Sequence, residues 1–181
     1  MNATSPTMLS MEGVNKRYPN FSLENFNLHV ERGEILGLVG PNGAGKSTCL
    51  RLLMGFIQAD SGRIQVMGKS MPEHCVSIKQ EVAYISEDMR LYTDETIEWH
   101  MNFVKQFYPG WDAGFAAHIL DKFDLNRNQK IKTLSLGQRI KSALLLALAR
   151  RPKLLVLDEP STGLDPVARF ELTQALSLIH I

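Results

Sequence analysis

Residues 40–48 combine three glycines with a lysine, a serine and a threonine in the order GPNGAGKST, which fits the pattern GxxxxGK[ST]. Glycines allow the backbone to turn tightly, so that its N–H groups can point at phosphate oxygens. Lys46 can reach the β- and γ-phosphates, and the Ser47 hydroxyl is a hard oxygen ligand that suits magnesium. The segment therefore predicts a loop that binds a nucleoside triphosphate, which we expect to be ATP, together with Mg²⁺. The residues predicted to bind the nucleotide are Gly40, Asn42, Gly43, Ala44, Gly45, Lys46, Ser47 and Thr48.

A second candidate lies where the apolar run 154–157 ends in Asp158, Glu159 and Pro160. A carboxylate at the end of a strand beside a phosphate loop can hold magnesium through water, which is the role predicted for Asp158. Glu159 would then polarise an attacking water, so it is the predicted catalytic residue. Adjacent strand residues normally face opposite ways, but a turn forced by Pro160 would let both carboxylates face the nucleotide. The alternative is an ordinary strand that ends in a charged loop.

The apolar pattern around these segments alternates between strands and helices. Residues 21–30 alternate apolar and polar, with a slip near Asn25, which indicates a half-exposed antiparallel strand. Residues 34–39 have almost no polar face, as expected of a strand covered on both sides. Ser135 and Gln138 have the spacing of a helix capping box.

Strands that alternate with helices predict a layered α/β fold with a parallel sheet. The expected strands are 8–14, 21–30, 34–39, 63–67, 81–85 and 153–157, and the expected helices are 46–56, 94–108, 113–123, 135–150 and 166–179. The middle of the chain, about 90–140, is expected to be a helical insert into the α/β core. A length of 181 residues suits one domain, or one domain with a small insert.

Composition and charge indicate which partners and surroundings to expect. Lys and Arg number 20 against 19 Asp and Glu, so the formal net charge is +1, which gives no electrostatic footprint for nucleic acid. Cys49 and Cys75 have no metal-ligand spacing, so we expect two free thiols in a reducing compartment. No apolar run approaches the roughly 20 residues of a spanning helix. We therefore expect a soluble, cytoplasmic protein that reaches a membrane only through a partner.

Two further motifs complete an ordered set. LSLGQ occupies 134–138 and STGLDP occupies 161–166, on either side of the LDEP segment. The order of phosphate loop, helical insert, LSxGQ, LDEP and STGLDP resembles the ATP-binding subunits of ABC transporters, and the resemblance covers almost the whole chain. It implies a P-loop NTPase fold with a RecA-like parallel sheet core, an N-terminal antiparallel β part and the helical insert, all in a single domain 1–181.

The resemblance also implies roles for residues outside the phosphate loop. In that family two nucleotide-binding domains meet head to tail, so Ser135, Gly137 and Gln138 would bind the ATP held on the partner's phosphate loop. Asp165 would link the two sites, and Tyr18 would stack on adenine. The residues alone leave two simpler alternatives open. One is an ordinary helix cap at Ser135, and the other is a tyrosine in a turn beside Pro19.

Three positions depart from the family pattern. Glu87 stands where the family usually has a glutamine, and its carboxylate is predicted to ligate magnesium. Leu136 replaces the first glycine of LSGGQ. The family also has a further strand that closes with a histidine, but only fifteen residues run from Pro166 to His180. His180 is therefore expected at a helix end, and the chain is expected to be C-terminally truncated.

The expected function is ATP binding and hydrolysis that drives transport through a separate transmembrane permease subunit. A second nucleotide-binding domain, as a homodimer or a heterodimer, is the other expected partner, and the location is the inner face of the cell membrane. The phrase at 107–112 resembles small bacterial exporters and inclines the prediction to export. Two alternatives are a soluble ABC ATPase that acts on nucleic acid or ribosomes, and a non-catalytic ATP-binding fragment. A GTPase is disfavoured because no NKxD element is present.

Overall fold

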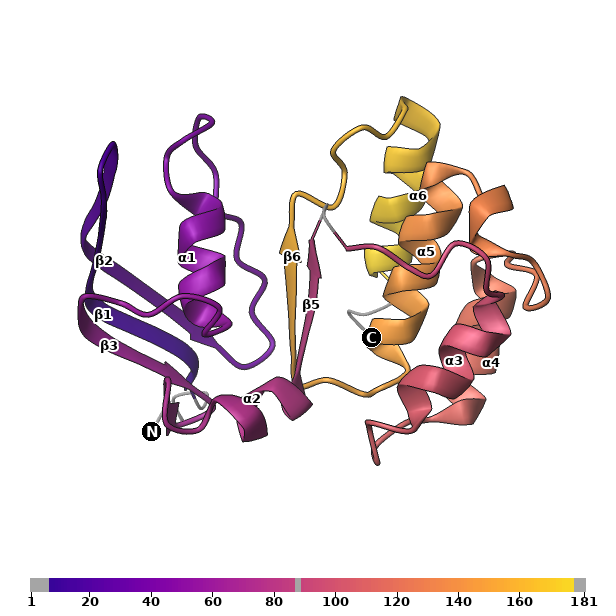
Figure 1. Ribbon diagram of the computed structural model, residues 1–181, viewed down its shortest axis with the longest axis horizontal. Coiled ribbons are helices and arrows are strands. Elements are labelled where there is room, and N and C mark those ends of the chain that lie inside the picture. The colour runs from indigo at the N-terminus through magenta and orange to yellow at the C-terminus, as the bar shows by residue number, and fades with distance from the viewer. Residues whose placement is uncertain (1–6, 87–88, 178–181) are drawn as a thin grey trace, which may run out of the picture. The chain divides into compact units, whose positions relative to one another are not determined.

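The computed structural model describes residues 7–86 and 89–177, which form two compact units (Figure 1). The first unit ends at Glu81 and the second begins at Val82. Two of the predicted residues, Glu87 and His180, lie outside the described residues.

The first unit contains an antiparallel sheet in the order β2-β1-β3-β4. Its strands are β1 (Thr7–Tyr18), β2 (Phe21–Glu31), β3 (Ser61–Val66) and β4 (Lys69–Ser70). The first two strands and β3 confirm the expectation for 8–14, 21–30 and 63–67, while β4 was not predicted. The expected slip near Asn25 is also confirmed, because the pairing of β1 with β2 shifts register there and Asn25 has a φ of 47°. Such a bulge bends and twists the strand that carries it.

The predicted buried strand at 34–39 is wrong for this structure. Residues 34–40 form no regular element, and the side chains of Ile35 and Val39 are 74% and 97% exposed. An apolar run becomes a buried strand only if neighbouring strands supply its ladder bonds. The described strands of the first unit pair antiparallel with one another, whereas the described parallel strands belong to the second unit. Residues 34–39 therefore find no described ladder partner within their own unit.

Two helices complete the first unit. They are α1 (Lys46–Leu53) and α2 (Cys75–Glu81). Helix α1 confirms the helix expected directly after the phosphate loop and ends a few residues earlier than expected, with Met54 as its C-cap. Its inward side buries Cys49, Leu52 and Leu53. This packing fixes the helix whose first turn carries Lys46 and Ser47.

The second unit holds a pair of parallel strands and its own helices. The strands are β5 (Val82–Ser86) and β6 (Leu154–Asp158), and the helices are α3 (Ile97–Lys105), α4 (Ala113–Lys122), the 3₁₀ turn η1 (Ile131–Thr133), α5 (Leu136–Leu148) and α6 (Pro166–Ser177). Strand β5 pairs with β6 so that Tyr84 lies opposite Val156 and Ser86 opposite Asp158. Except for η1, these elements match expected strands and helices to within a few residues, as far as 177.

Helix α5 is the centre of the second unit. It contacts α3, α4, α6 and β5, and in Figure 1 it stands between α6 and the α3–α4 pair. Its residues 142–148 are all buried, with Leu144 and Leu145 among the most enclosed side chains. A helix that is apolar on nearly every side is expected to lie inside a core. No described helix has the length and apolarity that a bilayer-spanning segment needs.

Candidate nucleotide-binding site

The phosphate loop depends on two glycines in the left-handed region. Gly43 has a φ of 82° and Gly45, the N-cap of α1, has a φ of 92°. A Cβ atom on Gly45 would lie 2.6 Å from Cζ of Phe21 on β2. The left-handed backbone therefore favours glycine at position 45, and any larger residue there would also have to displace the Phe21 ring.

Lys46 lies across this loop in the described structure. Its Nζ donates to the carbonyl oxygen of Gly40 at 2.9 Å and to that of Pro41 at 3.1 Å. The Ala44 N–H donates to the Pro41 carbonyl at 3.2 Å, which closes the turn. The loop residues Asn42 and Ala44 are exposed. The ammonium group is thus held over the loop where a phosphate group is expected.

The first turn of α1 has the features of an anion site. Ser47 and Thr48 lie in this turn and are half-buried. The helix has no side-chain hydrogen bond at its N-cap and no acidic residue in its first turn. The N–H groups and positive dipole end of a helix favour a bound anion such as phosphate. The structure therefore offers at this turn the local geometry that the sequence predicted.

Tyr18 is linked to the loop through Phe21, a residue that the sequence analysis did not select. The two rings lie 6.4 Å apart between centroids, and the same Phe21 ring limits the space at Gly45. The Tyr18 side chain is 42% exposed at the end of β1. An exposed aromatic face beside a phosphate loop suits stacking on a base. Position 21 appears in the sequence only as an apolar strand residue, and nothing in the spacing signals its contact with residue 45.

In the second unit, Asp158 ends β6 and is 7% exposed. Its Oδ2 accepts a hydrogen bond from the Tyr84 hydroxyl at 3.1 Å. Buried carboxylates need such donors, because an unpaired buried charge is costly. Sequence reasoning missed Tyr84, since the contact depends on the register of β5 against β6.

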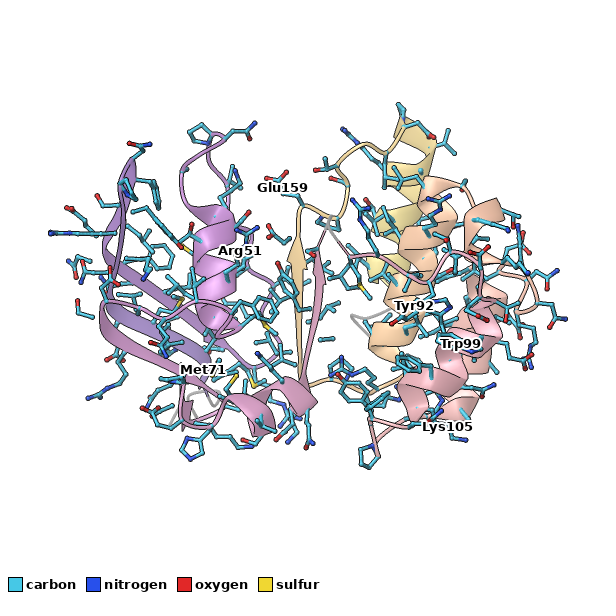
Figure 2. All side chains as sticks on the ribbon, viewed as in Figure 1. Arg51, Met71, Tyr92, Trp99, Lys105 and Glu159 are labelled. Carbon is cyan, nitrogen blue, oxygen red and sulfur yellow. The ribbon has the colours of Figure 1, made fainter. Side chains whose placement is uncertain are left out.

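Glu159 follows directly and is exposed, with its Oε2 accepting from the Thr162 hydroxyl at 3.1 Å. Figure 2 shows Glu159 at the end of β6. The sequence predicted that Pro160 would end the strand alternation. In the structure the alternation already ends at Glu159, which has a φ of 50°. Non-glycine residues seldom adopt this conformation, and such residues cluster at functional sites.

The predicted capping box at the start of α5 is confirmed. The Ser135 Oγ accepts from the Gln138 N–H at 3.2 Å, and the Gln138 Oε1 accepts from the Ser135 N–H at 3.0 Å. A Cβ on Gly137 would lie 3.2 Å from the Ala168 Cβ, so only a small residue fits there. Leu136 is 47% exposed, and its Cδ2 lies 3.4 Å from the place of a Cβ on Gly163. Ser135 and Gln138 therefore serve as an ordinary cap here, and this arrangement leaves the Leu136 side chain on the surface.

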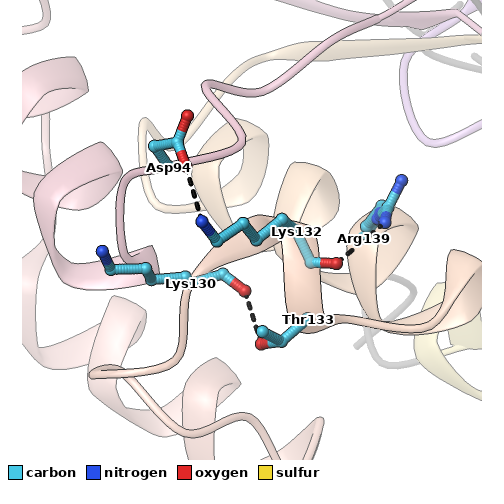
Figure 3. A network of polar contacts seen from close by, with 5 residues as sticks. All are labelled: Asp94, Lys130, Lys132, Thr133 and Arg139. Atoms are coloured by element: carbon cyan, nitrogen blue, oxygen red, sulfur yellow. Dashed lines mark hydrogen bonds and ion pairs between the residues drawn. The ribbon is translucent and has the colours of Figure 1, made fainter.

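Polar contacts hold the segment before Ser135 in place (Figure 3). Lys132 Nζ pairs with Asp94 Oδ1 at 2.8 Å, and this hydrogen bond holds the pKa of the Asp94 carboxyl below its ordinary value. Arg139 Nε donates to the Leu134 carbonyl at 3.2 Å, and its Nη2 donates to the Lys132 carbonyl at 3.4 Å. The start of α5 is thus tied to the loop that precedes α3.

Asp165 is the corresponding residue at the start of α6. Its Oδ1 accepts from the N–H groups of Val167 and Ala168, both at 2.9 Å. The residue that was expected to link two sites thus caps a helix of its own unit. An Asp in this position stabilises the first turn of the helix.

The donors predicted for magnesium fit a hard cation. Ser47 offers a hydroxyl in the first unit, and Asp158 offers a carboxylate in the second. Oxygen donors of this kind suit Mg²⁺, which usually keeps several waters and takes one or two carboxylates with substrate phosphates. In the described part of the chain, no three residues among His, Cys, Asp and Glu group as a metal cage.

Known proteins are similar to this chain in sequence. The family model described as ABC transporter matches residues 23–162. The ABC transporter ATP-binding protein YtrB of Bacillus subtilis is 34% identical over 157 residues, which is 87% of this chain and 53% of that protein. The Nod factor export ATP-binding protein I of Ralstonia nicotianae is 32% identical over 178 residues, covering 95% of this chain and 56% of that protein. The chain thus spans about half the length of these curated relatives.

A solved structure described as the ATP binding subunit of an ABC transporter superposes with a TM-score of 0.82 at 28% identity. The match covers 96% of this chain and 75% of the other. The predicted fold class, an α/β P-loop NTPase with an N-terminal antiparallel part, is confirmed by this match together with the sheets described above. The ordered motifs, the fold and the sequence matches lead to one conclusion. The chain belongs to the family of ABC transporter ATP-binding proteins.

Proposed function

We propose that this chain binds and hydrolyses ATP with Mg²⁺ as the nucleotide-binding subunit of an ABC transporter. In this proposal, hydrolysis drives export through a separate transmembrane subunit. The observation that supports it most is the loop at 40–45, in which left-handed glycines and the Lys46 ammonium lie at the uncapped start of α1. The name of one relative refers to export, which favours that direction.

The residues divide the chemistry between them. Lys46 would exchange its two carbonyl acceptors for phosphate oxygens, while the N–H groups of the loop and α1 hold the remaining phosphate charge. Ser47 and Asp158 would hold the metal ion. The bound ion would neutralise part of the phosphate charge. Glu159 would orient the attacking water and accept its proton, and the Thr162 hydroxyl holds that carboxylate in place. Tyr18 would stack on the adenine ring.

A second nucleotide-binding domain is the first proposed partner, as a homodimer or a heterodimer. The start of α5 supports this, because Ser135 and Leu136 are exposed, whereas residues 142–148 of the same helix are buried. The N-terminus of a helix favours an anion, so Ser135 and Gly137, with Gln138 beside them, could contact the triphosphate held by the partner. Glu87 remains a proposed ligand to magnesium, and it lies outside the described residues.

A membrane subunit is the second proposed partner, and a row of exposed aromatic side chains supports it. The row, called here the aromatic row, consists of Tyr92, Trp99, Phe103 and Phe107. Trp99 stacks on Phe103 at 5.0 Å, and Tyr92 and Phe107 meet these rings edge-on at 5.4 and 5.1 Å. Figure 2 shows Tyr92 and Trp99 close together at α3. Contiguous exposed aromatic surface marks an interaction site, so the chain would lie on the inner face of the membrane through this contact.

The test is nucleotide binding followed by phosphate release, with matched variants. Wild-type chain should bind the fluorescent nucleotide mant-ATP in the presence of MgCl₂, and Lys46→Ala should weaken binding by at least about tenfold through loss of a charge-assisted contact. Lys122→Ala, an exposed lysine at the end of α4, serves as the control. Glu159→Gln should retain binding while it lowers phosphate release. Equal affinities for Lys46→Ala and Lys122→Ala would remove the basis of the proposal.

A further inference from the structure

Tyr84 has no role in the function proposed above, yet it contacts the predicted magnesium carboxylate. Its hydroxyl donates to Oδ2 of Asp158 at 3.1 Å. Asp158 is 7% exposed and Tyr84 is half-buried, so bulk water competes little for this bond. A hydrogen bond to an ionised acceptor is stronger than one between neutral groups.

The register of the two strands explains why a tyrosine is needed at this position. Tyr84 lies opposite Val156, two residues before Asp158, and both side chains fall on the same face of the β5–β6 pair. Two residues along a strand span roughly 6.5 Å, which a short hydroxyl side chain cannot cover. The phenol is long enough to reach the carboxylate and carries a donor at its tip.

Tyr84 is one of the residues that line a cavity of about 240 Å³ in the second unit. Its lining also includes Met89, Leu91, Val104, Tyr108 and Arg150. The Arg150 guanidinium lies 3.4 Å from the centre of the Tyr108 ring and donates to the Val82 carbonyl at 3.1 Å, so this part of the wall is fixed to β5. The hydrogen bond to Asp158 sets the direction of the Tyr84 hydroxyl.

We propose that Tyr84 is a positioning residue for the magnesium-binding carboxylate of Asp158, an inference that rests on the proposed function. The phenol holds one carboxylate oxygen and thereby sets the orientation in which Asp158 meets the ion or its bound water. Partners of this kind orient metal ligands, and their loss weakens metal binding while the ligand itself remains. Tyr84 acts only through Asp158 and does not contact nucleotide.

The experiment uses Tyr84→Phe, which keeps the ring in the cavity wall and removes only the hydroxyl. Mant-ATP fluorescence is recorded as MgCl₂ is added, and the magnesium concentration at half-maximal signal is compared with mant-ATP affinity in EDTA. Tyr84→Phe should raise the half-maximal magnesium concentration roughly 3- to 10-fold, as expected for one lost hydrogen bond, and leave the affinity in EDTA unchanged. Tyr108→Phe, another ring of the same cavity, should change neither value.

A double-mutant cycle separates positioning from general damage. In an Asp158→Asn background, Tyr84→Phe should add no further change in the magnesium requirement, because both substitutions remove the same arrangement. Additive effects would overturn the proposal, as would an unchanged magnesium requirement in Tyr84→Phe. If Tyr84→Phe fails to fold, the cycle is run with Tyr84→Leu, which fills the position with an apolar side chain that carries no donor, and the same outcomes apply.

Magnesium-dependent binding of mant-ATP by the wild type distinguishes a failure of this inference from a failure of the proposed function. Wild-type chain that shows no magnesium-dependent binding of mant-ATP contradicts the proposed function itself. Wild-type chain that binds with magnesium, together with a Tyr84→Phe variant of equal magnesium requirement, contradicts only the role of Tyr84.

Discussion

At position 45 of the phosphate loop, the backbone conformation and the available space both favour glycine. Gly45 adopts a left-handed conformation and also faces the Phe21 ring, whereas Gly33 has a similar φ of 81° with no atom within 4 Å of a Cβ. The sequence pattern predicted the tight turn at Gly45, because glycines in such a loop allow the backbone to turn. It could not predict the contact with Phe21, because Phe21 is distant along the chain.

These two glycines give a matched pair of substitutions. Gly33→Ala should lower the free energy of unfolding by about 1–2 kcal/mol through backbone strain alone. Gly45→Ala should lower it by about 1–3 kcal/mol more, because its new methyl group meets Phe21. Urea unfolding monitored by circular dichroism measures both values. Equal losses for the two variants would show that the Phe21 contact does not limit position 45.

The cysteines differ in their surroundings, and this makes a second prediction at the residue scale. Cys49 is buried in α1, and burial raises the pKa of its thiol above the ordinary value, whereas Cys75 is half-buried at the start of α2. A raised pKa leaves less reactive thiolate at any given pH. N-ethylmaleimide at pH 8 should therefore modify Cys75 much faster than Cys49.

The modified residues can be identified by peptide mass spectrometry, with Cys75→Ser as the control that leaves Cys49 alone. In that variant, labelling should remain slow until denaturant is added. Raising the pH should accelerate the labelling of Cys49 only above the pH range in which an ordinary thiol ionises. Rapid native labelling of Cys49 would contradict its burial in α1.

At the scale of elements, periodicity and caps predicted most helices and strands. Helix α5 begins at Ser135, whose capping box with Gln138 was predicted from the spacing, whereas the Asp112 cap of α4 was not predicted. The prediction of a strand at 34–39 was wrong. An apolar run predicts a buried strand only if partners elsewhere in the chain cover it, and local sequence does not contain those partners. The bond between Tyr84 and Asp158 was missed for a related reason, since strand register is not contained in local spacing.

The capping box of α5 gives the prediction at this scale. Ser135→Ala removes the acceptor for the Gln138 N–H and should lower the free energy of unfolding by about 1 kcal/mol. Thr96→Ala, which removes the equivalent cap of α3, should cost a similar amount and serves as the comparison. If Ser135 also binds nucleotide on a partner, only Ser135→Ala should weaken ATP-dependent dimer formation, measured by light scattering. An equal effect of both variants on the dimer would leave Ser135 as a cap alone.

At the scale of the whole molecule, the predicted site residues occur in both units. The loop with Lys46 and Ser47 lies in the first unit, while Asp158, Glu159 and Ser135 lie in the second. The ordered motifs predicted this set of residues, and the family model matches 23–162, a range that includes all of them. The near-zero net charge agrees with a partner recognised through apolar and aromatic surface, such as the aromatic row, rather than through a basic patch.

The central claim is that the loop at 40–48 is where ATP binds. Hydrogen–deuterium exchange with and without MgATP tests it most directly, because bound phosphates engage the N–H groups of this loop and of the first turn of α1. We predict slower exchange in peptides that cover 40–53 when MgATP is added, and loss of that protection in Lys46→Ala. Unchanged exchange in this segment at saturating MgATP, or equal protection in Lys46→Ala, would contradict the claim.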